Sequence, residues 1–439
     1  MSTSALHPPA TPTFILRGHA APIHALQIFS QNLRLVSGDA DGWIVVWDLI
    51  FKRPVAVWKA HEGAVLEVKG FSLGGGRLTE IYTHGRDHKL RVWRFRVQNE
   101  EILQKTLPVD AKDQTSQTQT QIQPWLIHSL PVNALNFCAF SMLSLPSETN
   151  APQGNDEGQS DIPPSSALIA VPNALDSGAI DLFHLPGERR ICTIPTDPAV
   201  KTGMVMAVQL IRSPCSRDLY VAAAFEDGHV MVSACRGVFR DTGLLVDAAK
   251  SWRWERLYLA RPHSQPVLSI DLVPSGEYFL SSSADAVLAK HPVAQAGAAG
   301  AHETPLKSVN TKHAGQQGLK VRSDGKIFAT AGWDSRVRVY SCKSMKELAV
   351  LKWHKEGCYA VAFADVSSMP ADTTVSPSTT EQVPEKGEEE ATGKTAIIQR
   401  GGNDFSLTQI QRQRSLKVQN THWLAAGSKD GKISLWDIY

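Results

Sequence analysis

The sequence lacks the features that mark membrane, secreted and metal-binding proteins. None of its 439 residues falls in an apolar run that approaches the ~18 residues of a membrane-spanning helix. The opening residues, MSTSALHPPATPT, contain no apolar core and so do not form a secretory signal. The six cysteines are scattered without a CxxC pair, which argues against a zinc ribbon and against a disulfide framework. With 45 basic and 43 acidic residues, the chain has no strong attraction for nucleic acid or membrane.

Motifs of common enzyme sites are also missing. The glycine-rich stretch SLGGGRL at 72–78 is not followed by GK[ST], so it is not a phosphate-binding loop. No GxSxG, HExxH or EF-hand pattern occurs. We therefore expect no enzyme activity, no cofactor and no metal, and can assign no catalytic residue.

What the sequence does contain is a repeat with a period of about 40 to 45 residues. Its mark is an Asp followed six residues later by Trp or Tyr, in segments such as SGDADGWIVVWDL, THGRDHKLRVWRF, TAGWDSRVRVYSC and AGSKDGKISLWDI. A His in a short polar turn precedes most copies, followed by an alternating apolar strand. Seven copies can be counted, near 18–58, 60–107, 125–195, 203–261, 262–311, 312–352 and 353–439.

In its ordered His, Asp-Gly and Trp-Asp landmarks this repeat resembles the WD40 family. The resemblance implies an all-β, seven-bladed WD40 β-propeller, in which each blade is a sheet of four antiparallel strands. It also implies that the segment before each His belongs to the preceding blade. The final strand, within KISLWDI, would otherwise leave an exposed sheet edge. We expect PTFILRGH (12–19) to pair with it and close 11–439 into one domain, with 1–10 as a disordered tail.

Recurring His, Ser/Thr and Asp residues also suggest a hydrolytic triad, but a triad needs one constellation rather than one in every repeat. In WD40 blades such residues hydrogen-bond with the Trp indole and satisfy buried polar groups around a tight turn. The resemblance implies this structural role for thirteen residues. They are His19, Ser37, Asp41, Trp47, His61, Thr83, Asp87, Trp93, Asp334, Tyr340, His354, Asp430 and Trp436.

Five insertions interrupt the repeats, at 108–123, 144–167, 236–255, 294–305 and 365–420. Each falls between the first and second or the third and fourth strand of its blade, so all five emerge on one face of a propeller. We expect a shared partner site on the opposite face, where turns are short. A blander alternative is that insertions simply avoid the turns that carry the His-Asp network.

The last insertion carries an acidic run, EKGEEE (385–390), and a basic stretch, QIQRQRSLK (409–417). Because few apolar residues anchor 372–413, we expect this segment to be mobile and dispensable for partner binding. The rival interpretation is that 396–417, which contains Ile397, Phe405 and Ile410, docks on a blade or on a partner.

The chain as a whole resembles the fungal ASTRA-associated protein 1 family. The stretches that carry the likeness include PPATPTFILRGHAAPIHALQIF, AHEGAVLEVKGF, GAIDLFHLPGERR and LAAGSKDGKISLWDIY, and together they span 8–439. The resemblance implies a non-enzymatic scaffold subunit of the ASTRA complex, a chromatin regulator that also helps to mature phosphatidylinositol-3-kinase-related kinases. It implies ASTRA subunits, Tel/Tti-type cochaperone subunits and RuvB-like helicases as partners, without direct nucleic-acid or membrane contact. It further implies one copy within a larger complex, in the nucleus and also in the cytoplasm.

A second hypothesis is a substrate receptor of a cullin-type ubiquitin ligase. GWDSR (332–336) matches the short WDxR motif of such receptors. In that family the motif follows the third strand, whereas Asp334 precedes it here, which favours coincidence.

Overall fold

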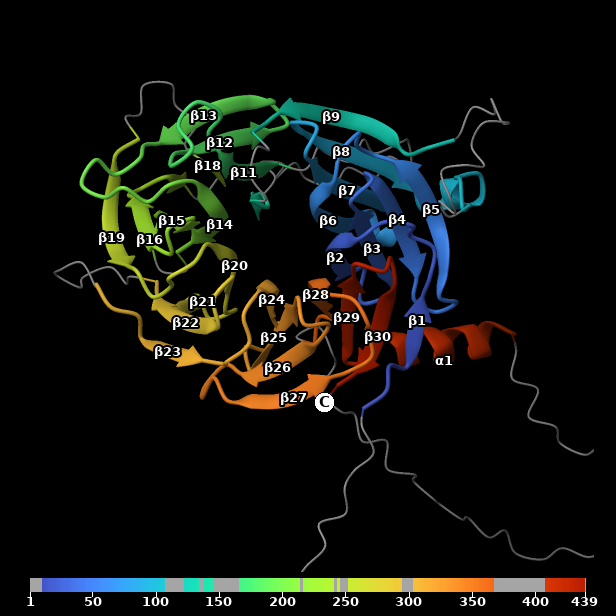
Figure 1. The fold of residues 1–439 in the computed structure, drawn as a ribbon. Helices are drawn as coiled ribbons and strands as arrows, with labels where there is room; N and C mark the ends of the chain where they lie inside the picture. The colour runs from blue at the N-terminus through green and yellow to red at the C-terminus, as the bar shows by residue number, and fades with distance from the viewer. Residues whose placement is uncertain are drawn as a thin grey trace, which may run out of the picture.

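Seven antiparallel sheets of four strands surround a central axis in the computed structural model of the protein (Figure 1). The structure describes residues 10–106, 122–133, 138–145, 166–213, 216–240, 243–244, 252–293, 303–366 and 407–438. The seven-bladed β-propeller predicted from the repeat is therefore confirmed. Within the described residues, no helix has the length and apolar character needed to cross a membrane.

Each blade runs from an inner strand a to an outer strand d. Blades one and two are β2 (Ile23–Phe29), β3 (Arg34–Asp39), β4 (Trp43–Asp48), β5 (Arg53–Lys59), then β6 (Val65–Leu73), β7 (Leu78–Gly85), β8 (Lys89–Arg96), β9 (Trp125–Pro131). Blades three and four are β10 (Ser141–Ser144), β11 (Ala167–Pro172), β12 (Ile180–Leu185), β13 (Arg189–Ile194), then β14 (Val205–Arg212), β15 (Leu219–Phe225), β16 (Val230–Cys235), β19 (Trp254–Ala260). Blades five and six are β20 (Val267–Leu272), β21 (Tyr278–Ser283), β22 (Val287–Pro292), β23 (Lys307–Asn310), then β24 (Gln316–Val321), β25 (Ile327–Gly332), β26 (Val337–Ser341), β27 (Glu347–Leu351). Blade seven is β28 (Cys358–Phe363), β29 (Trp423–Ser428), β30 (Ile433–Asp437) and β1 (Phe14–Leu16).

The ring is closed by β1, the first strand of the chain, which forms strand d of the last blade. Phe14 lies opposite Leu435 and Leu16 opposite Ile433 in an antiparallel ladder. The backbone N–H of Thr13 extends the ladder with a 2.8 Å hydrogen bond to the carbonyl of Leu435. Closure by the N-terminal strand is thus confirmed, and it covers the edge that β30 would otherwise expose.

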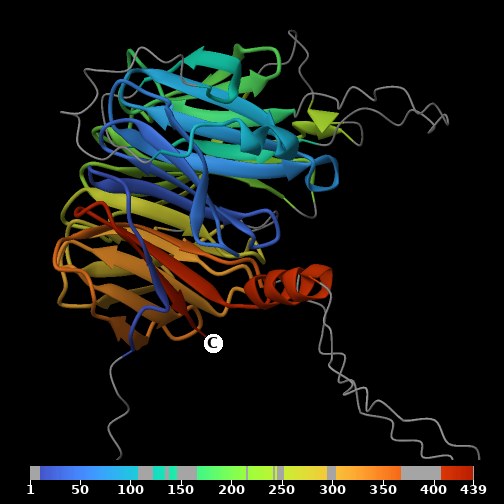
Figure 2. The same cartoon turned by 90° about the vertical axis from the view of Figure 1, so that its right-hand side faces the viewer.

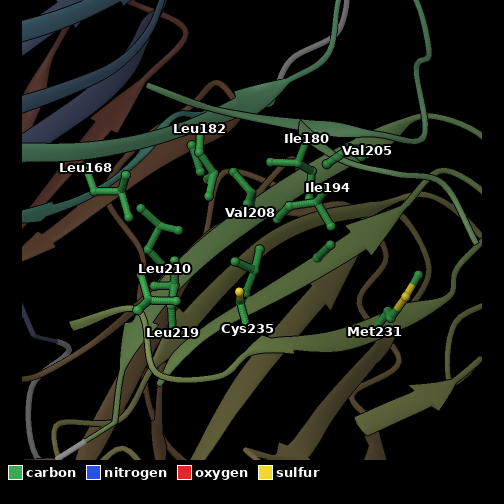
Figure 3. Packing of buried hydrophobic residues seen from close by; sticks show 14 of the residues in the cluster. Leu168, Ile180, Leu182, Ile194, Val205, Val208, Leu210, Leu219, Met231 and Cys235 are labelled. Atoms are coloured by element: carbon green, nitrogen blue, oxygen red, sulfur yellow. The ribbon is translucent and has the colours of Figure 1, made fainter. Parts of the chain in front are cut away.

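Apolar side chains fill the space between neighbouring blades. Every residue of β15 is buried, as expected for a strand covered on both faces. Between blades three and four, Leu168 and Leu182 face Val208 and Leu210 across the interface (Figure 3). Burying one such side chain contributes roughly 1.5–3 kcal/mol, so each interface is a substantial part of the stability.

Adjacent blades also meet through glycines in the turns between strands b and c. In three of these turns a glycine has a positive φ and lies directly against the carbonyl of the His that opens the next blade. A Cβ atom there would fall about 2 Å from that oxygen, which only glycine avoids. The pairs are Gly42 with His61, Gly228 with His263, and Gly431 with His19, at 1.9, 2.1 and 2.2 Å.

The segments predicted as insertions lie between strands a and b or between c and d. They separate β8 from β9, β10 from β11, β16 from β19, β22 from β23, and β28 from β29. Large parts of them, and of the predicted tail 1–10, lie outside the described residues. The described parts include a hairpin of β17 (Phe239–Arg240) and β18 (Gly243–Leu244). Two 3₁₀ turns lie outside the predicted insertions: η1 (Gly74–Gly76) joins β6 to β7, and η2 (Val97–Glu101) follows β8.

One element was missed from the sequence: helix α1 (Leu407–Gln419), which projects from the face that carries the insertions (Figure 2). The sequence did not predict this helix at 407–413, and the expectation that 372–413 is mobile and dispensable for partner binding stays a prediction. The remainder, 372–406, lies outside the described residues. Residues 407–419 contain neither Gly nor Pro and are rich in Leu, Gln, Arg and Lys, which favour helices.

The base of this last insertion is clamped by Asn32, a buried residue in the turn between β2 and β3. Its side-chain amide donates to the carbonyls of Asp365 and Gln419, at 2.8 and 3.1 Å, and its Oδ1 accepts the N–H of Asp365 at 2.8 Å. The helix end is further fixed by Val418, which is buried and whose carbonyl accepts from Trp423 Nε1. One side chain therefore holds both ends of the insertion.

Ring closure generates the first prediction. Deleting residues 1–17 removes β1 and should lower the melting temperature of the whole domain, although terminal residues are normally dispensable. Deleting residues 1–10, which precede the strand, should leave it nearly unchanged. Thermal unfolding followed by circular dichroism measures both, and equal melting temperatures for the 17-residue truncation and the full chain would contradict closure.

Candidate functional site

The residues singled out from the repeat form hydrogen-bonded networks between strands, best developed in blade two. His61 Nδ1 lies 2.8 Å from Asp87 Oδ1, and its Nε2 lies 2.8 Å from Thr83 Oγ1. Trp93 Nε1 donates to the same hydroxyl at 3.1 Å. Burial opposes ionisation of Asp87, but hydrogen bonds from His61 and Arg91 outweigh it and hold the carboxyl pKa well below its usual range.

Blade one has the same network with a different carboxylate. His19 Nδ1 lies 2.7 Å from Oδ2 of Asp39, His19 Nε2 lies 2.7 Å from Ser37 Oγ, and Trp47 Nε1 donates to Ser37. Asp41, the expected member, is exposed and contributes only its backbone N–H, which donates to Asp39. The assignment of Asp41 from the sequence is therefore wrong.

The reason lies in the two-residue period of a strand. Asp39 ends β3 two residues after Ser37, so its side chain points to the same face, toward His19. In blade two the corresponding position is Gly85, where a Cβ would fall 2.3 Å from the His61 ring. There the turn residue Asp87 reaches the His instead. The spacing of six residues between Asp and Trp does not separate these two geometries.

Blade seven takes its hydroxyl from a different strand. His354 Nε2 lies 2.8 Å from Ser434 Oγ, and Trp436 Nε1 donates to that oxygen at 2.8 Å. Ser434 is on strand c, directly opposite Ala426, which occupies the place that Ser37 has in blade one. Asp430 Oδ1 is 3.8 Å from His354 Nδ1, too far for a hydrogen bond. It accepts from Lys432 instead.

Blade six does not bring its predicted residues to a His. Asp334 accepts two hydrogen bonds from the Arg338 guanidinium, and the buried Tyr340 stacks on Phe328. Lys312 stands at the position that His19 and His61 have in blades one and two, and the nearby Gln316 side chain donates to Thr311 instead.

The longest network, in blade five, was missed. Tyr258 OH lies 2.7 Å from His291 Nδ1, His291 Nε2 lies 2.8 Å from Ser281 Oγ, and Ser281 Oγ lies 2.8 Å from His263 Nε2. His263 Nδ1 lies 3.2 Å from Asp285. His291 follows Asp285 by six residues, the spacing of the repeat, so it stands where other blades have Trp. That spacing was the available signal, but the repeat as defined from the sequence admits only Trp or Tyr at this position.

The carboxylate sets the direction of every bond in blade five. His263 must donate Nδ1–H to Asp285, so its Nε2 accepts from the Ser281 hydroxyl. Ser281 then accepts Nε2–H of His291, whose Nδ1 accepts from Tyr258. His291 thus supplies the N–H that Trp supplies elsewhere, and its Nδ1 can accept from Tyr258 only when the ring is neutral. Burial and the neighbouring His263 lower its pKa to about 3.

Asp, His and Ser in this order have the connectivity of a hydrolytic triad, but their setting is that of a structural lock. Ser37, Ser281 and Thr83 have no exposed surface, and the His rings that contact them are buried. Each hydroxyl already has donors and acceptors within the network. A substrate has no access to these oxygens, and the networks satisfy polar groups that folding buries.

The accessible feature of the ring is the mouth of its central channel on the short-turn face. In six blades strand a has a β-bulge after its first residue, which leaves one residue out of the ladder. All six bulge residues line a cavity of about 230 Å³ on the axis, together with the a strands of all seven blades. They are His24, Leu66, Met206, Leu268, Gln317 and Tyr359.

Three of the six residues of this collar, Leu66, Met206 and Leu268, are aliphatic, and His24 and Tyr359 add aromatic rings. The rings of His24 and Tyr359 are stacked, with centroids 5.2 Å apart, and Trp333 donates to Gln317 at 2.8 Å. Trp333 remains 48% exposed, and Leu175, in the corresponding turn of blade three, is 97% exposed. Large exposed apolar side chains on either side of a channel mouth are typical of a protein-binding surface.

The ring of seven four-stranded blades and its His, Ser/Thr, Asp and Trp networks define a WD40-type β-propeller. A model of the ASTRA-associated protein 1 family matches residues 12–436, and the chain belongs to this family. ASTRA-associated protein 1 of Aspergillus niger is 65% identical over 443 residues, covering 98% of both chains. The Aspergillus flavus protein of that name is 61% identical over the whole of both chains, and the Schizosaccharomyces pombe protein is 31% identical over 83% of this chain and 98% of its own.

The two aspartates of blade one provide the second prediction. Asp39→Ala removes the buried acceptor of His19 and should cost roughly 2–4 kcal/mol of unfolding free energy. Asp41→Ala, two residues away and exposed, should change it by less than about 0.5 kcal/mol. Urea unfolding compares the two variants, and a larger loss for Asp41→Ala would restore the assignment made from sequence.

The third prediction concerns pH. Burial lowers the pKa of His84 and His291 to about 3 and that of His354 to about 4, each well below the ordinary value. Because the unfolded chain takes up these protons first, the stabilisation is complete above about pH 6.5 and is lost as the pH falls toward 3. His291→Gln should flatten this dependence in urea unfolding series, whereas His88→Gln, in an exposed turn, should retain the wild-type slope.

Proposed function

We propose that the protein is a non-enzymatic scaffold subunit of the ASTRA complex. In this role it contributes to chromatin remodelling and to the maturation of phosphatidylinositol-3-kinase-related kinases with cochaperones. Its partners are ASTRA subunits, Tel/Tti-type cochaperone subunits and RuvB-like helicases, and it works in the nucleus, with a second pool in the cytoplasm. The observation that carries this proposal is the match over residues 12–436 to a family whose name states association with ASTRA.

The arrangement of the described residues supports binding rather than catalysis. The Ser and Thr hydroxyls beside His are sealed within blades, whereas large apolar groups are exposed on turns of the ring. Among the side chains that the structure describes, no group of three or more His, Cys, Asp or Glu residues is arranged to hold a metal ion.

We place the main partner contact on the short-turn face. Trp333 and Leu175 lie in b–c turns of blades six and three, on opposite sides of the ring. A partner that covers both spans the channel mouth, and large anchors such as Trp carry much of the binding energy of an interface. The strand ends to which the insertions attach lie on the opposite face.

The fourth prediction tests this assignment by affinity purification of the tagged chain, with mass spectrometry of the copurified proteins. The double variant Leu175→Ala/Trp333→Ala should recover several-fold less of the other ASTRA subunits. Leu348→Ala, at an equally exposed position on the outer strand β27, serves as the matched control and should recover the wild-type amount. Melting temperatures of all variants should agree, since the altered side chains are exposed.

A second arm replaces 372–406 by a short Gly/Ser link and should also leave recovery unchanged. Loss of the complex in this arm, with normal recovery for the double variant, would move the contact to the opposite face. Copurification of a cullin adaptor in place of ASTRA subunits would support the ubiquitin-ligase alternative. In the structure GWDSR forms the b–c turn of blade six, where Asp334 is bound by Arg338.

A further inference from the structure

The side-chain ammonium groups of two lysines in the central channel make no hydrogen bond to the residues that the structure describes. Lys69, on strand a of blade two, and Lys320, on strand a of blade six, both line the cavity behind the bulge collar. They also line a second cavity of about 240 Å³ that lies toward the ends of the a strands. Their side chains keep 26% and 30% of their surface accessible, so a bound group can reach both.

The carboxylates nearby leave these ammonium groups incompletely satisfied. The nearest is Glu67, whose Oε2 lies 3.9 Å from Lys69 Nζ and 4.0 Å from Lys320 Nζ, beyond hydrogen-bond distance for both. One oxygen atom thus faces two cations from different blades. Asp271, the other acid of the cluster, directs Oδ2 to the backbone N–H of Val321 at 2.7 Å.

We propose that the central channel is a binding site for a compact anionic group, a carboxylate or a phosphate, held between the ammonium groups of Lys69 and Lys320. Each ammonium offers three donors, and a carboxylate or phosphate has enough acceptor oxygens to use donors from both at once. The volume of 230 Å³ far exceeds the ~10–15 Å³ that admits one water, so such a group fits.

Burial and neighbouring charges act in opposite directions on the ionisable groups of this cluster. Burial raises the pKa of Asp271, against the effect of Lys320, of the Val321 N–H and of Lys69. Burial also lowers the pKa of Lys69, while Glu67 acts in the opposite direction. Burial opposes the charge of Lys320 as well, but Glu67 and Asp271 outweigh it and raise the pKa of Lys320, so this side chain keeps its ammonium form.

Two sources can supply this chemistry. A small anion can enter from solution, or an acidic side chain of an associated subunit can reach through the collar on the short-turn face. In the second case the aliphatic collar residues Leu66, Met206 and Leu268 contact the aliphatic stem while the lysines hold the carboxylate. Both sources require the same two ammonium groups, so one set of variants tests them.

The fifth prediction has two arms and four substitutions. Lys69→Met and Lys320→Met keep an unbranched apolar chain and remove the charge, whereas Lys326→Met, in an exposed turn of blade six, is the matched control. In the first arm the melting temperature is measured in acetate or phosphate against chloride at equal ionic strength. The wild type and Lys326→Met should melt at least about 2 °C higher in one of the two anions, and the channel variants should not.

In the second arm the assembly purified with the tagged chain is treated with a carbodiimide, which joins lysines to carboxylates in contact. Linkage of Lys69 or Lys320 to an acidic residue of another subunit, without an effect of free anions, identifies the partner as the source. The proposal is overturned if the anions shift all variants equally, or if they shift none while only links within the chain form. Lys69→Arg, which keeps the charge, should respond as wild type and guards against loss of fold in the Met variant.

Discussion

The closed ring is the constraint on which the other features depend. A blade on its own would expose to water the two apolar faces that its neighbours cover in the ring, so each blade depends on the blades beside it. The closure therefore rests on β1, a strand of three residues, and on contacts such as Gly431 against the carbonyl of His19. This junction repeats the arrangement of Gly42 with His61, so the boundary between the last and the first blade has the same contact as the boundary between blades one and two.

The buried networks stabilise the turns on which the short-turn face is built. In each blade that has a network, His and Ser or Thr side chains hold a turn by hydrogen bonds, and the positions of these turns determine the shape of that face. The same turns start the a strands, where the bulge that recurs in six of the seven blades turns one residue into the channel. A repeated local distortion thus builds a continuous collar from side chains that are far apart in the sequence. Its chemistry varies with six unrelated residues, from Leu66 to Tyr359.

The fold could be predicted because repetition averages out local uncertainty. Seven copies, three strong and four degenerate, identify a propeller together more firmly than any one of them does alone. The details of the networks could not be predicted, because a linear spacing does not show which way a side chain points. Asp39 and Asp41 are both plausible on spacing, and only the strand face separates them. In blade seven, Ala426 stands where blade one has Ser37, and the hydroxyl comes from Ser434 on the neighbouring strand. This relation can be seen only once the two strands are paired. Helix α1 was hidden by the polar composition around it.

The clamp made by Asn32 separates the last insertion from the mechanics of the ring. Because the Asn32 side chain binds Asp365 and Gln419, at the two ends of the insertion, the propeller offers the same two attachment points whatever sequence lies between them. Added length then costs only slowly growing loop entropy and transmits little strain to blade seven. At such a pair of attachment points, one inserted segment can be exchanged for another, in evolution or by design, without a change in the blades that hold it.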